Sequence, residues 1–230
     1  MKLKIRRYPE GKEEFEIFTD KALTLLDLLQ KAKEEDPTLA FRSMCRAGIC
    51  GTCGVKLGGK PVLACSTWID PWEEIVIVEP LDGYEIIRDL VVEHEGMVLR
   101  LKRYKVWLHS LENNVKVSEE INRKTSKSWE CILCGICDSL CPVLSVDNSF
   151  GGPLLLTRIH KYLFDPRNAK QDMSLESLRE MKSNLCTHCM NCSYVCPKRL
   201  MPEFLIKQED SLLLEKGLVQ KESGFDFLSF

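Results

Sequence analysis

Twelve cysteines in this chain of 230 residues fall into three groups of four. The first group has the spacing C-x4-C-x2-C with one more cysteine shortly after, and the other two both read C-x2-C-x2-C-x3-C-P. The groups are Cys45, Cys50, Cys53 and Cys65; Cys131, Cys134, Cys137 and Cys141; and Cys186, Cys189, Cys192 and Cys196. These spacings predict one plant-type [2Fe–2S] site and two cubane sites of the bacterial ferredoxin type. Three clusters in one chain indicate an electron relay.

The repeated run is an internal duplication of the kind that gives two-cluster ferredoxins, in which the fourth cysteine of each run binds the other cluster. The sequence therefore predicts two interlocked ligand sets. One [4Fe–4S] set is Cys131, Cys134, Cys137 and Cys196, and the second is Cys141, Cys186, Cys189 and Cys192. Such interlocking would hold the two clusters close together, as electron tunnelling requires.

The composition favours a cytoplasmic protein with reduced thiols. The opening MKLKIRRYPEGKEEF is basic but lacks an apolar segment, so we expect no export signal. No apolar run approaches the roughly 18 residues of a membrane span, so any membrane attachment would come through a partner. In a reducing compartment thiols bind metals. The net charge of −2 gives no field that would favour nucleic acid.

Other uses of the cysteines are open alternatives. A disulfide framework would explain the even count but not the repeated spacing. Zinc sites use paired C-x2-C units, but they do not need a three-cysteine run that ends in C-P. A further hypothesis is a structural or binding protein in which clusters or zinc ions only stabilise the fold.

Few other residues indicate chemistry. His188 lies inside the third group, where we expect a hydrogen bond to a cluster or a surface position, because Rieske ligation needs two histidines. Trp107, Trp129 and Met190 are predicted to be packing residues. No phosphate loop, nucleophile elbow or paired-carboxylate motif is found, so we expect no substrate site. A short basic patch is predicted to be a solvated helix face; it comprises Arg100, Lys102, Arg103 and Lys105.

The fold class predicted is α+β, with residues 1–95 forming strands and one early helix. Thr24 to Asp27 has the form of a capping box that opens a helix, and Asp36-Pro37 ends it. Strand patterns follow at 54–57, 61–64 and 74–79. A helix across a mixed sheet is the β-grasp arrangement of plant-type ferredoxins. Residues 96–230 are predicted to be a second, helical domain with both cubane sites, and a charged helix is expected to reach about Leu111.

The order of these motifs resembles the iron–sulfur subunit of succinate dehydrogenase and fumarate reductase over nearly the whole chain. The matching stretches are DPTLAFRSMCRAGICGTCGVKLGGKPVLAC (36–65), IRDLVVEHEG (87–96), CILCGICDSLCP (131–142), GGPLLL (151–156) and CTHCMNCSYVCPKRLMP (186–202).

This resemblance implies that the chain takes single electrons between a partner subunit, which alone carries FAD, and an acceptor. The acceptor is usually quinone at a membrane anchor, so a peripheral position on the inner face of the cell membrane is expected. The first domain would face the flavoprotein and the second would face the anchor. The resemblance also implies a role in the tricarboxylic acid cycle or the respiratory chain. It leaves the direction, succinate oxidation or fumarate reduction, open.

Two departures from the family pattern concern the last cluster. The common pattern has no cysteine at the position of Cys189 and holds a [3Fe–4S] cluster, whereas the thiol here predicts a second [4Fe–4S] cluster. Relatives also carry a tryptophan after the second motif and a histidine after the first cysteine of the third, where this chain has 143–146 (VLSV) and Thr187. We therefore expect an atypical acceptor. Alternatives are the iron–sulfur subunit of another flavin-dependent dehydrogenase and of a thiol-linked fumarate reductase.

Overall fold

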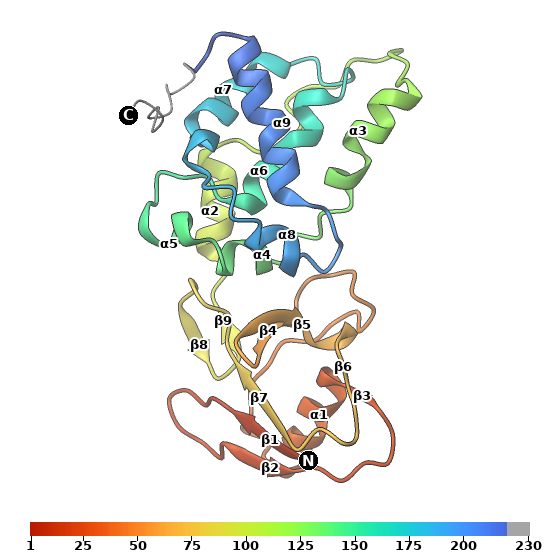
Figure 1. The fold of residues 1–230 in the computed structure, drawn as a ribbon, viewed down its shortest axis with the longest axis vertical. Coiled ribbons are helices and arrows are strands. Elements are labelled where there is room, and N and C mark those ends of the chain that lie inside the picture. Colours follow the sequence, from red (N-terminus) through yellow and green to blue (C-terminus); the bar gives the residue numbers. More distant parts are fainter. Residues whose placement is uncertain (220–230) are drawn as a thin grey trace, which may run out of the picture.

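Two regions, one rich in strands and one helical, are stacked along the long axis of the molecule (Figure 1). The structure is a computed structural model and describes residues 1–219. The N-terminal region combines a sheet with one helix, and the C-terminal region is built from helices joined by short loops. This arrangement confirms the predicted α+β class and the order of its two parts.

The main sheet is mixed, as the β-grasp prediction requires. Its strand order is β2-β1-β7-β4-β5, and β1 is parallel to β7 with Leu3 opposite Val76, whereas the other pairs are antiparallel. The strands are β1 (Lys2–Ile5), β2 (Glu14–Glu16), β4 (Gly54–Leu57), β5 (Lys60–Leu63) and β7 (Ile75–Glu79). Two short pairs flank it: β3 (Leu23–Thr24) with β6 (Trp68–Ile69), and β8 (Ile86–Arg88) with β9 (Val91–Val92).

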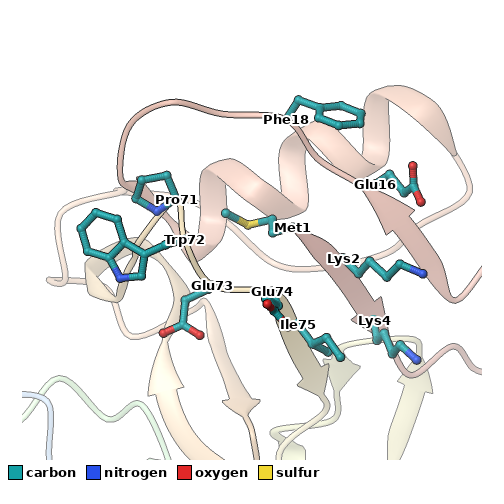
Figure 2. A pocket seen from close by; sticks show the side chains of 10 residues that line it. All are labelled: Met1, Lys2, Lys4, Glu16, Phe18, Pro71, Trp72, Glu73, Glu74 and Ile75. Atoms are coloured by element: carbon teal, nitrogen blue, oxygen red, sulfur yellow. The ribbon is translucent and has the colours of Figure 1, made fainter.

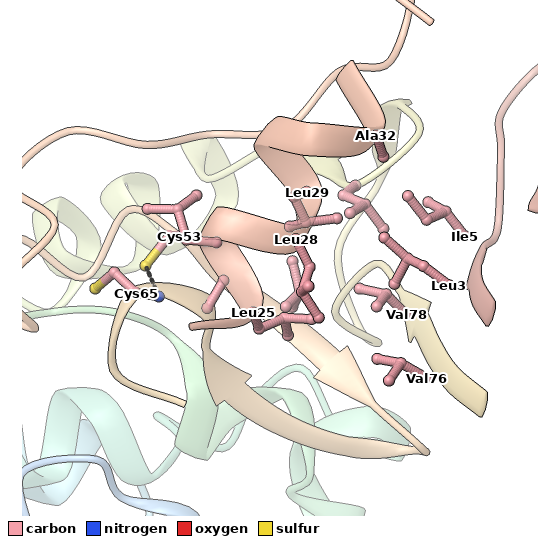
Figure 3. Packing of buried hydrophobic residues seen from close by; sticks show 14 of the residues in the cluster. Leu3, Ile5, Leu25, Leu28, Leu29, Ala32, Cys53, Cys65, Val76 and Val78 are labelled. Atoms are coloured by element: carbon pink, nitrogen blue, oxygen red, sulfur yellow. Dashed lines mark hydrogen bonds between the residues drawn. The ribbon is translucent and has the colours of Figure 1, made fainter. Parts of the chain in front are cut away.

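Helix α1 (Leu25–Glu35) packs between the sheet and two cysteines of the first group. Its start is the predicted capping box, because the Thr24 hydroxyl accepts a hydrogen bond from the Asp27 N–H and the Asp27 carboxylate accepts one from the Thr24 N–H. Its apolar face packs on the inner face of the sheet, and Cys53 and Cys65 lie in the same core (Figure 3). Packing of α1 on the sheet therefore positions two of the four cysteines.

The C-terminal region surrounds a central helix, α6. Its helices are α2 (Glu95–Arg103), α3 (Glu119–Trp129), α4 (Ile136–Ser139), α5 (Pro142–Val146), α6 (Pro153–Phe164), α7 (Gln171–Glu180), α8 (Asn191–Val195) and α9 (Pro202–Glu215). Two 3₁₀ turns, η1 (Ala64–Ser66) and η2 (Ser183–Leu185), complete the elements. Because α6 is apolar on most sides, α3, α7 and α9 all pack against it.

The predicted charged helix to Leu111 is wrong in its end point. Helix α2 ends at Arg103, and the next helix begins at Glu119. The chain turns at Lys105, whose φ of 51° is left-handed, and this turn buries both Tyr104 and Val106. Tertiary burial of those two side chains overrides the helical pattern. The predicted strand at 61–64 begins and ends one residue earlier, and that at 74–79 begins one residue later.

Candidate iron–sulfur sites

The first cysteine group occupies a loop before β4, together with Cys65 in η1. Several backbone N–H groups in this loop donate to sulfur. Ala47 N and Cys50 N lie 3.4 and 3.3 Å from Cys45 Sγ, and Gly48 N lies 3.3 Å from Cys65 Sγ. Donors directed at sulfur are the hydrogen bonds that stabilise thiolate ligands and tune cluster potentials.

This first site is half in the core and half at the surface. Cys45 is exposed, and hydrogen bonds from the N–H of Ala47 and its neighbours lower the pKa of its thiol to about 6. Cys53 is buried, and burial raises the pKa of its thiol to about 11. The Cys65 N–H donates to Cys53 Sγ at 3.5 Å (Figure 3), and the Thr52 hydroxyl donates to Cys50 Sγ at 3.1 Å. Hydrogen bonds to sulfur thus connect the loop that holds Cys45, Cys50 and Cys53 with Cys65 in η1.

The second motif lines a cavity in the helical region, together with one cysteine of the third motif. About 340 Å³ of empty space, part of it open to solvent, lies between the thiols. The cysteines are Cys131, Cys134, Cys137 and Cys196. Leu154 and Thr157 of α6 form another wall, and the Leu200 N–H donates to Cys196 Sγ at 3.4 Å. We call this space the first cavity.

The third motif lines a similar cavity. The cysteines here are Cys186, Cys189, Cys192 and, from the second motif, Cys141. Phe150, Ile206 and Glu203 contribute to the walls of this second cavity. The structure therefore brings each predicted set of four around one space, with one cysteine exchanged between the motifs.

The backbone repeats the duplication seen in the sequence. Leu133 and Gly135 in the second motif are left-handed, with φ of 54° and 76°. His188 and Met190, at the same offsets in the third motif, have φ of 52° and 66°. Non-glycine residues rarely adopt this conformation, so its recurrence indicates a required geometry. The two motifs curve around their cavities in the same way.

Burial makes bare thiolates costly in both cavities. It raises the pKa of Cys134 and of Cys192 to about 12, and that of Cys186 to about 11. Bound metal offsets this cost, because coordination deprotonates a thiol outright. In the chain up to residue 219 no three His, Cys, Asp or Glu side chains converge where a single metal ion could sit. The thiols stand around cavities instead, and soft sulfur ligands in that arrangement fit iron–sulfur clusters.

The first site lies directly against the first cavity. A Cβ added to Gly51 would lie 2.8 Å from Cys134 Cβ and 3.0 Å from the carbonyl oxygen of Ile132. Cys134 and Ile136 also belong to the hydrophobic core that contains Cys53. The helical region therefore extends into the N-terminal core at this point, and the three cysteine groups form a continuous series.

One basic residue behaves differently from the prediction. Arg100 Nη2 donates to Asp138 Oδ2 at 2.5 Å, and Nη1 donates to the Gly151 carbonyl at 3.0 Å. Asp138 Oδ1 also accepts from the Leu154 N–H at 2.9 Å. The predicted solvated face is thus wrong for Arg100, because buried Asp138, next to Cys137, attracts it inward. It is correct for Lys102 and Arg103, which are exposed on α2, whereas Lys105 is exposed but lies after the end of that helix.

His188 is partly exposed beside the second cavity and interacts with carboxylates. Its Nδ1 lies 3.2 Å from Glu203 Oε1, and its Nε2 lies 3.8 Å from Asp210 Oδ2. Trp129 packs as predicted, edge to face on Tyr162. The contacts of His188 therefore lie with helix α9.

Sequence reasoning missed two polar residues of α6. Thr157 lines the first cavity and is 1% exposed, and its hydroxyl has no hydrogen-bond partner within residues 1–219. Lys161 is also buried, with Nζ 4.1 Å from the centre of the Trp129 ring. Burial raises the pKa of Cys131, while the N–H of Leu133 and the charges of Arg158 and Lys161 act in the opposite direction. The only feature of the sequence that could have indicated Thr157 and Lys161 is their helical spacing, three and seven residues after Leu154 of the GGPLLL stretch.

A further hollow in the N-terminal region is remote from the cysteines. It lies at the ends of β1 and β2 and is lined by Lys2, Lys4, Phe18 and Trp72, among others (Figure 2). Phe18 and Trp72 are both exposed. No cysteine contributes to its walls, so it belongs to none of the three candidate sites.

Known domain families match both regions. The family described as a 2Fe-2S iron-sulfur cluster binding domain matches residues 2–99. The family described as a 4Fe-4S dicluster domain matches residues 127–200. The two matches follow the same order as the first site and the two cavities.

Curated relatives match over most of the chain. The succinate dehydrogenase iron-sulfur subunit of Coxiella burnetii is 32% identical, over 87% of this chain and 86% of the relative. The fumarate reductase iron-sulfur subunit of Haemophilus influenzae is 31% identical, over 90% of this chain and 91% of the relative. One subunit of the fumarate reductase (CoM/CoB) of Methanothermobacter marburgensis is 33% identical over 86% of this chain, which spans 41% of that relative.

A solved structure has the same fold. A chain of the Mycobacterium smegmatis Sdh1 complex in the apo form aligns with a TM-score of 0.81, at 21% identity, over 95% of this chain and 97% of that chain. In the described part of the protein, no helix has the length and apolar character needed to cross a membrane. The likeness to the curated relatives over nearly their whole length decides the family: this chain belongs to the iron–sulfur subunits of succinate dehydrogenases and fumarate reductases.

Proposed function

We propose that this chain is the electron-transfer subunit of a succinate dehydrogenase or fumarate reductase complex. It relays single electrons between an FAD-bearing subunit and an acceptor through three iron–sulfur clusters. The observation that carries the proposal is the contact of Gly51 with Cys134, which joins the surface loop site to the first of two cavities with exchanged cysteines. Adjacent sites of this kind form a path for electrons.

The ligand sets follow the cysteines that share each site. Cys45, Cys50, Cys53 and Cys65 would bind the [2Fe–2S] cluster. The set of the first cavity, Cys131, Cys134, Cys137 and Cys196, would bind a [4Fe–4S] cluster, and the set of the second, Cys141, Cys186, Cys189 and Cys192, would bind another. The clusters supply one-electron redox chemistry. The protein residues hold them, direct N–H donors at sulfur and, in the helical region, surround them with apolar walls.

Cys189 supports a second [4Fe–4S] cluster in preference to [3Fe–4S]. It lines the second cavity together with the three other cysteines, so four thiols are available there. Cys189 is exposed, whereas Cys192 is buried. Cys189 would therefore hold the cluster from the more exposed side of the cavity.

The exposures of the sites support an assignment of the two partners. The loop of the first site is exposed at Cys45, Met44 and Ile49, and we assign this face to the FAD-bearing subunit. The helical region would face the membrane anchor or another acceptor protein, which would hold the complex on the inner face of the cell membrane. We place the boundary of the two domains at residue 95, where α2 begins after the last strand.

An atypical acceptor is part of the proposal. Val143 and Thr187 line the second cavity. The stretch 143–146 has no tryptophan, and Thr187 stands where the family resemblance implies a histidine for a quinone pocket. The likeness to one subunit of a fumarate reductase (CoM/CoB) favours a thiol-linked complex as the second candidate. Assay of the purified complex with quinone and with thiol reductants separates the two.

Anaerobic EPR with iron quantitation tests the cluster assignment on the purified complex. About ten iron atoms per chain, one [2Fe–2S] signal and two interacting [4Fe–4S] signals are expected. About nine irons with a strong [3Fe–4S] signal in the oxidised state would contradict the role given to Cys189. Zinc in place of iron would refute the relay. As a check, Cys189→Ala should convert one [4Fe–4S] signal to [3Fe–4S] without loss of the other two clusters.

A further inference from the structure

Helix α6 turns one polar strip toward the first cavity. Leu154 and Thr157 line the cavity and are three residues apart, so they lie on one helix face. Arg158 and Lys161 follow Leu154 by four and seven residues and continue the same face. A helix buried on most sides thus places one hydroxyl in the wall of the cavity and carries two cations along the same face.

The hydroxyl of Thr157 lacks the partner that a helical threonine usually has. Threonine in a helix commonly donates to the carbonyl four residues earlier. Thr125 in α3 does this, with its Oγ1 3.0 Å from the Ile121 carbonyl. Thr157 is buried and makes no hydrogen bond within the described residues. Because a buried donor without an acceptor is destabilising, an acceptor inside the cavity would remove that penalty.

The two cations are also without an anionic partner. No carboxylate of residues 1–219 forms an ion pair with Arg158 or Lys161. Lys161 Nζ lies over two aromatic rings, 4.1 Å from the centre of Trp129 and 5.1 Å from that of Tyr162. Aromatic faces attract an ammonium group but do not neutralise it. An anionic group in the first cavity, which the same helix face borders at Leu154 and Thr157, would supply the missing negative charge.

The second cavity has the opposite electrostatic character. Glu203 lines it and is 3% exposed, and Asp210 acts electrostatically on Cys186. Lys207 Nζ lies 2.7 Å from Glu203 Oε1 and partly offsets that charge. At the first cavity the buried carboxylate next to the thiols, Asp138, is already paired with Arg100. Of the two cavities, the first is therefore the one to which the described residues bring net positive charge.

We propose that α6 sets the midpoint potential of the cluster bound by Cys131, Cys134, Cys137 and Cys196. The Thr157 hydroxyl would donate a hydrogen bond to a sulfur of this cluster, and Arg158 and Lys161 would stabilise the charge that reduction adds. Reduction adds one electron, taken from the neighbouring centre, breaks no bond and moves no proton. Hydrogen bonds and positive charge near sulfur favour the more negative state, so each contribution raises the potential. The inference rests on the proposed cluster assignment.

EPR-monitored redox titration of the intact complex tests the role of the hydroxyl. Thr157→Val should reduce the reduction equilibrium constant of one [4Fe–4S] cluster by about tenfold, which is about 59 mV for one electron. The potentials of the other two clusters should not change. Thr157→Ser keeps the hydroxyl and should restore the wild-type potential. Thr125→Val, which removes a hydroxyl already bonded within α3, is the matched control and should shift no potential.

A second variant tests the charge, and a second readout tests the hydrogen bond. Lys161→Gln should lower the potential of the same cluster, so the inference does not depend on one variant folding. After exchange into D₂O, the reduced wild-type cluster should show a deuteron coupling that Thr157→Val lacks and Thr157→Ser retains. A full iron content with unshifted potentials in both variants would overturn this inference alone. A wild-type complex without [4Fe–4S] signals would overturn the proposed function as well.

Discussion

The loop site of the N-terminal region and the cavities of the helical region differ in the exposure of their thiols and in the direction in which the thiol pKa values are shifted. The loop leaves Cys45 exposed and surrounds its sulfur with backbone donors, which lower the pKa of the thiol. The cavities bury most of their thiols, and burial raises the pKa of Cys134 and Cys192. The comparison teaches that backbone donors stabilise an exposed thiolate, whereas buried thiolates need bound metal to offset the cost of burying their charge.

The largest difference is expected on loss of an exchanged cysteine. Cys196→Ala removes a thiol that the third motif contributes to the first cavity, so we expect loss of that [4Fe–4S] cluster and weakened binding in the second cavity. Iron content should fall by at least about four atoms per chain. By contrast, Cys45→Ser at the exposed site should keep its cluster with an altered EPR spectrum. Iron analysis and EPR of both variants measure this contrast, and equal losses would contradict it.

Two buried arginine–aspartate pairs, one in each region, sharpen the comparison. Arg7 Nε donates to Asp89 Oδ1 at 2.8 Å in the N-terminal region, away from the cysteines. Arg100 pairs with Asp138 next to Cys137. Loss of one partner of a buried pair costs about 3–5 kcal/mol, so Arg7→Gln and Arg100→Gln should both lower the free energy of unfolding by that order.

Only Arg100→Gln should also change a [4Fe–4S] spectrum, because only its partner adjoins a cysteine of a cavity. Chemical denaturation gives the stability of each variant, and EPR gives the spectrum. A change of the [4Fe–4S] spectrum in Arg7→Gln would contradict this prediction, because it would show that the Arg7–Asp89 pair also affects a cluster of the helical region.

A smaller effect is expected at the contact between the regions. Gly51 and Gly83 have nearly the same left-handed φ, 73° and 75°, but an added Cβ meets Cys134 only at Gly51 and has open space at Gly83. Each alanine substitution should cost about 1–2 kcal/mol of backbone strain. Gly51→Ala should cost a further 1–3 kcal/mol, roughly, because the methyl group is overpacked. Denaturation of both variants isolates that difference, and equal costs would refute the close contact.

The smallest perturbation is chemical labelling of the iron-free chain. The thiolate is the reactive form, and a thiol is deprotonated above its pKa. Cys45 should therefore react with iodoacetamide at a rate that is half-maximal near pH 6, whereas Cys134 and Cys192 should stay unreactive until well above neutral pH. Mass spectrometry of the labelled peptides across pH 5–9 measures the rates. Equal rates at the three positions would contradict the difference between loop and cavity.

The local parts of the fold could be predicted from the sequence. The capping box at Thr24 reflects contacts within a few residues, and the structure confirms it. The cysteine spacing also predicted which thiols share a site, because the repeated motif carries its own geometry. The ligation itself stays a prediction until iron is measured.

The parts that depend on distant contacts could not be predicted. Arg100 was expected to be solvated because its partner Asp138 is remote in sequence. The helix expected to reach Leu111 ends early because burial of Tyr104 and Val106 requires a turn. The unpartnered hydroxyl of Thr157 is a property of the assembled cavity, and nothing in the GGPLLL stretch predicts it.

The exchange of Cys141 and Cys196 between the cavities has a consequence for biosynthesis. A ribosome adds Cys131, Cys134 and Cys137 before it reaches Cys196, so the first cavity lacks its fourth thiol until the third motif has been synthesised. The second cavity also waits for the third motif. Neither cavity has all four of its cysteines until the third motif of the nascent chain has left the ribosome. On the proposed cluster assignment, iron therefore reaches the helical region only after the third motif has been synthesised, whereas the N-terminal loop can receive its cluster much earlier.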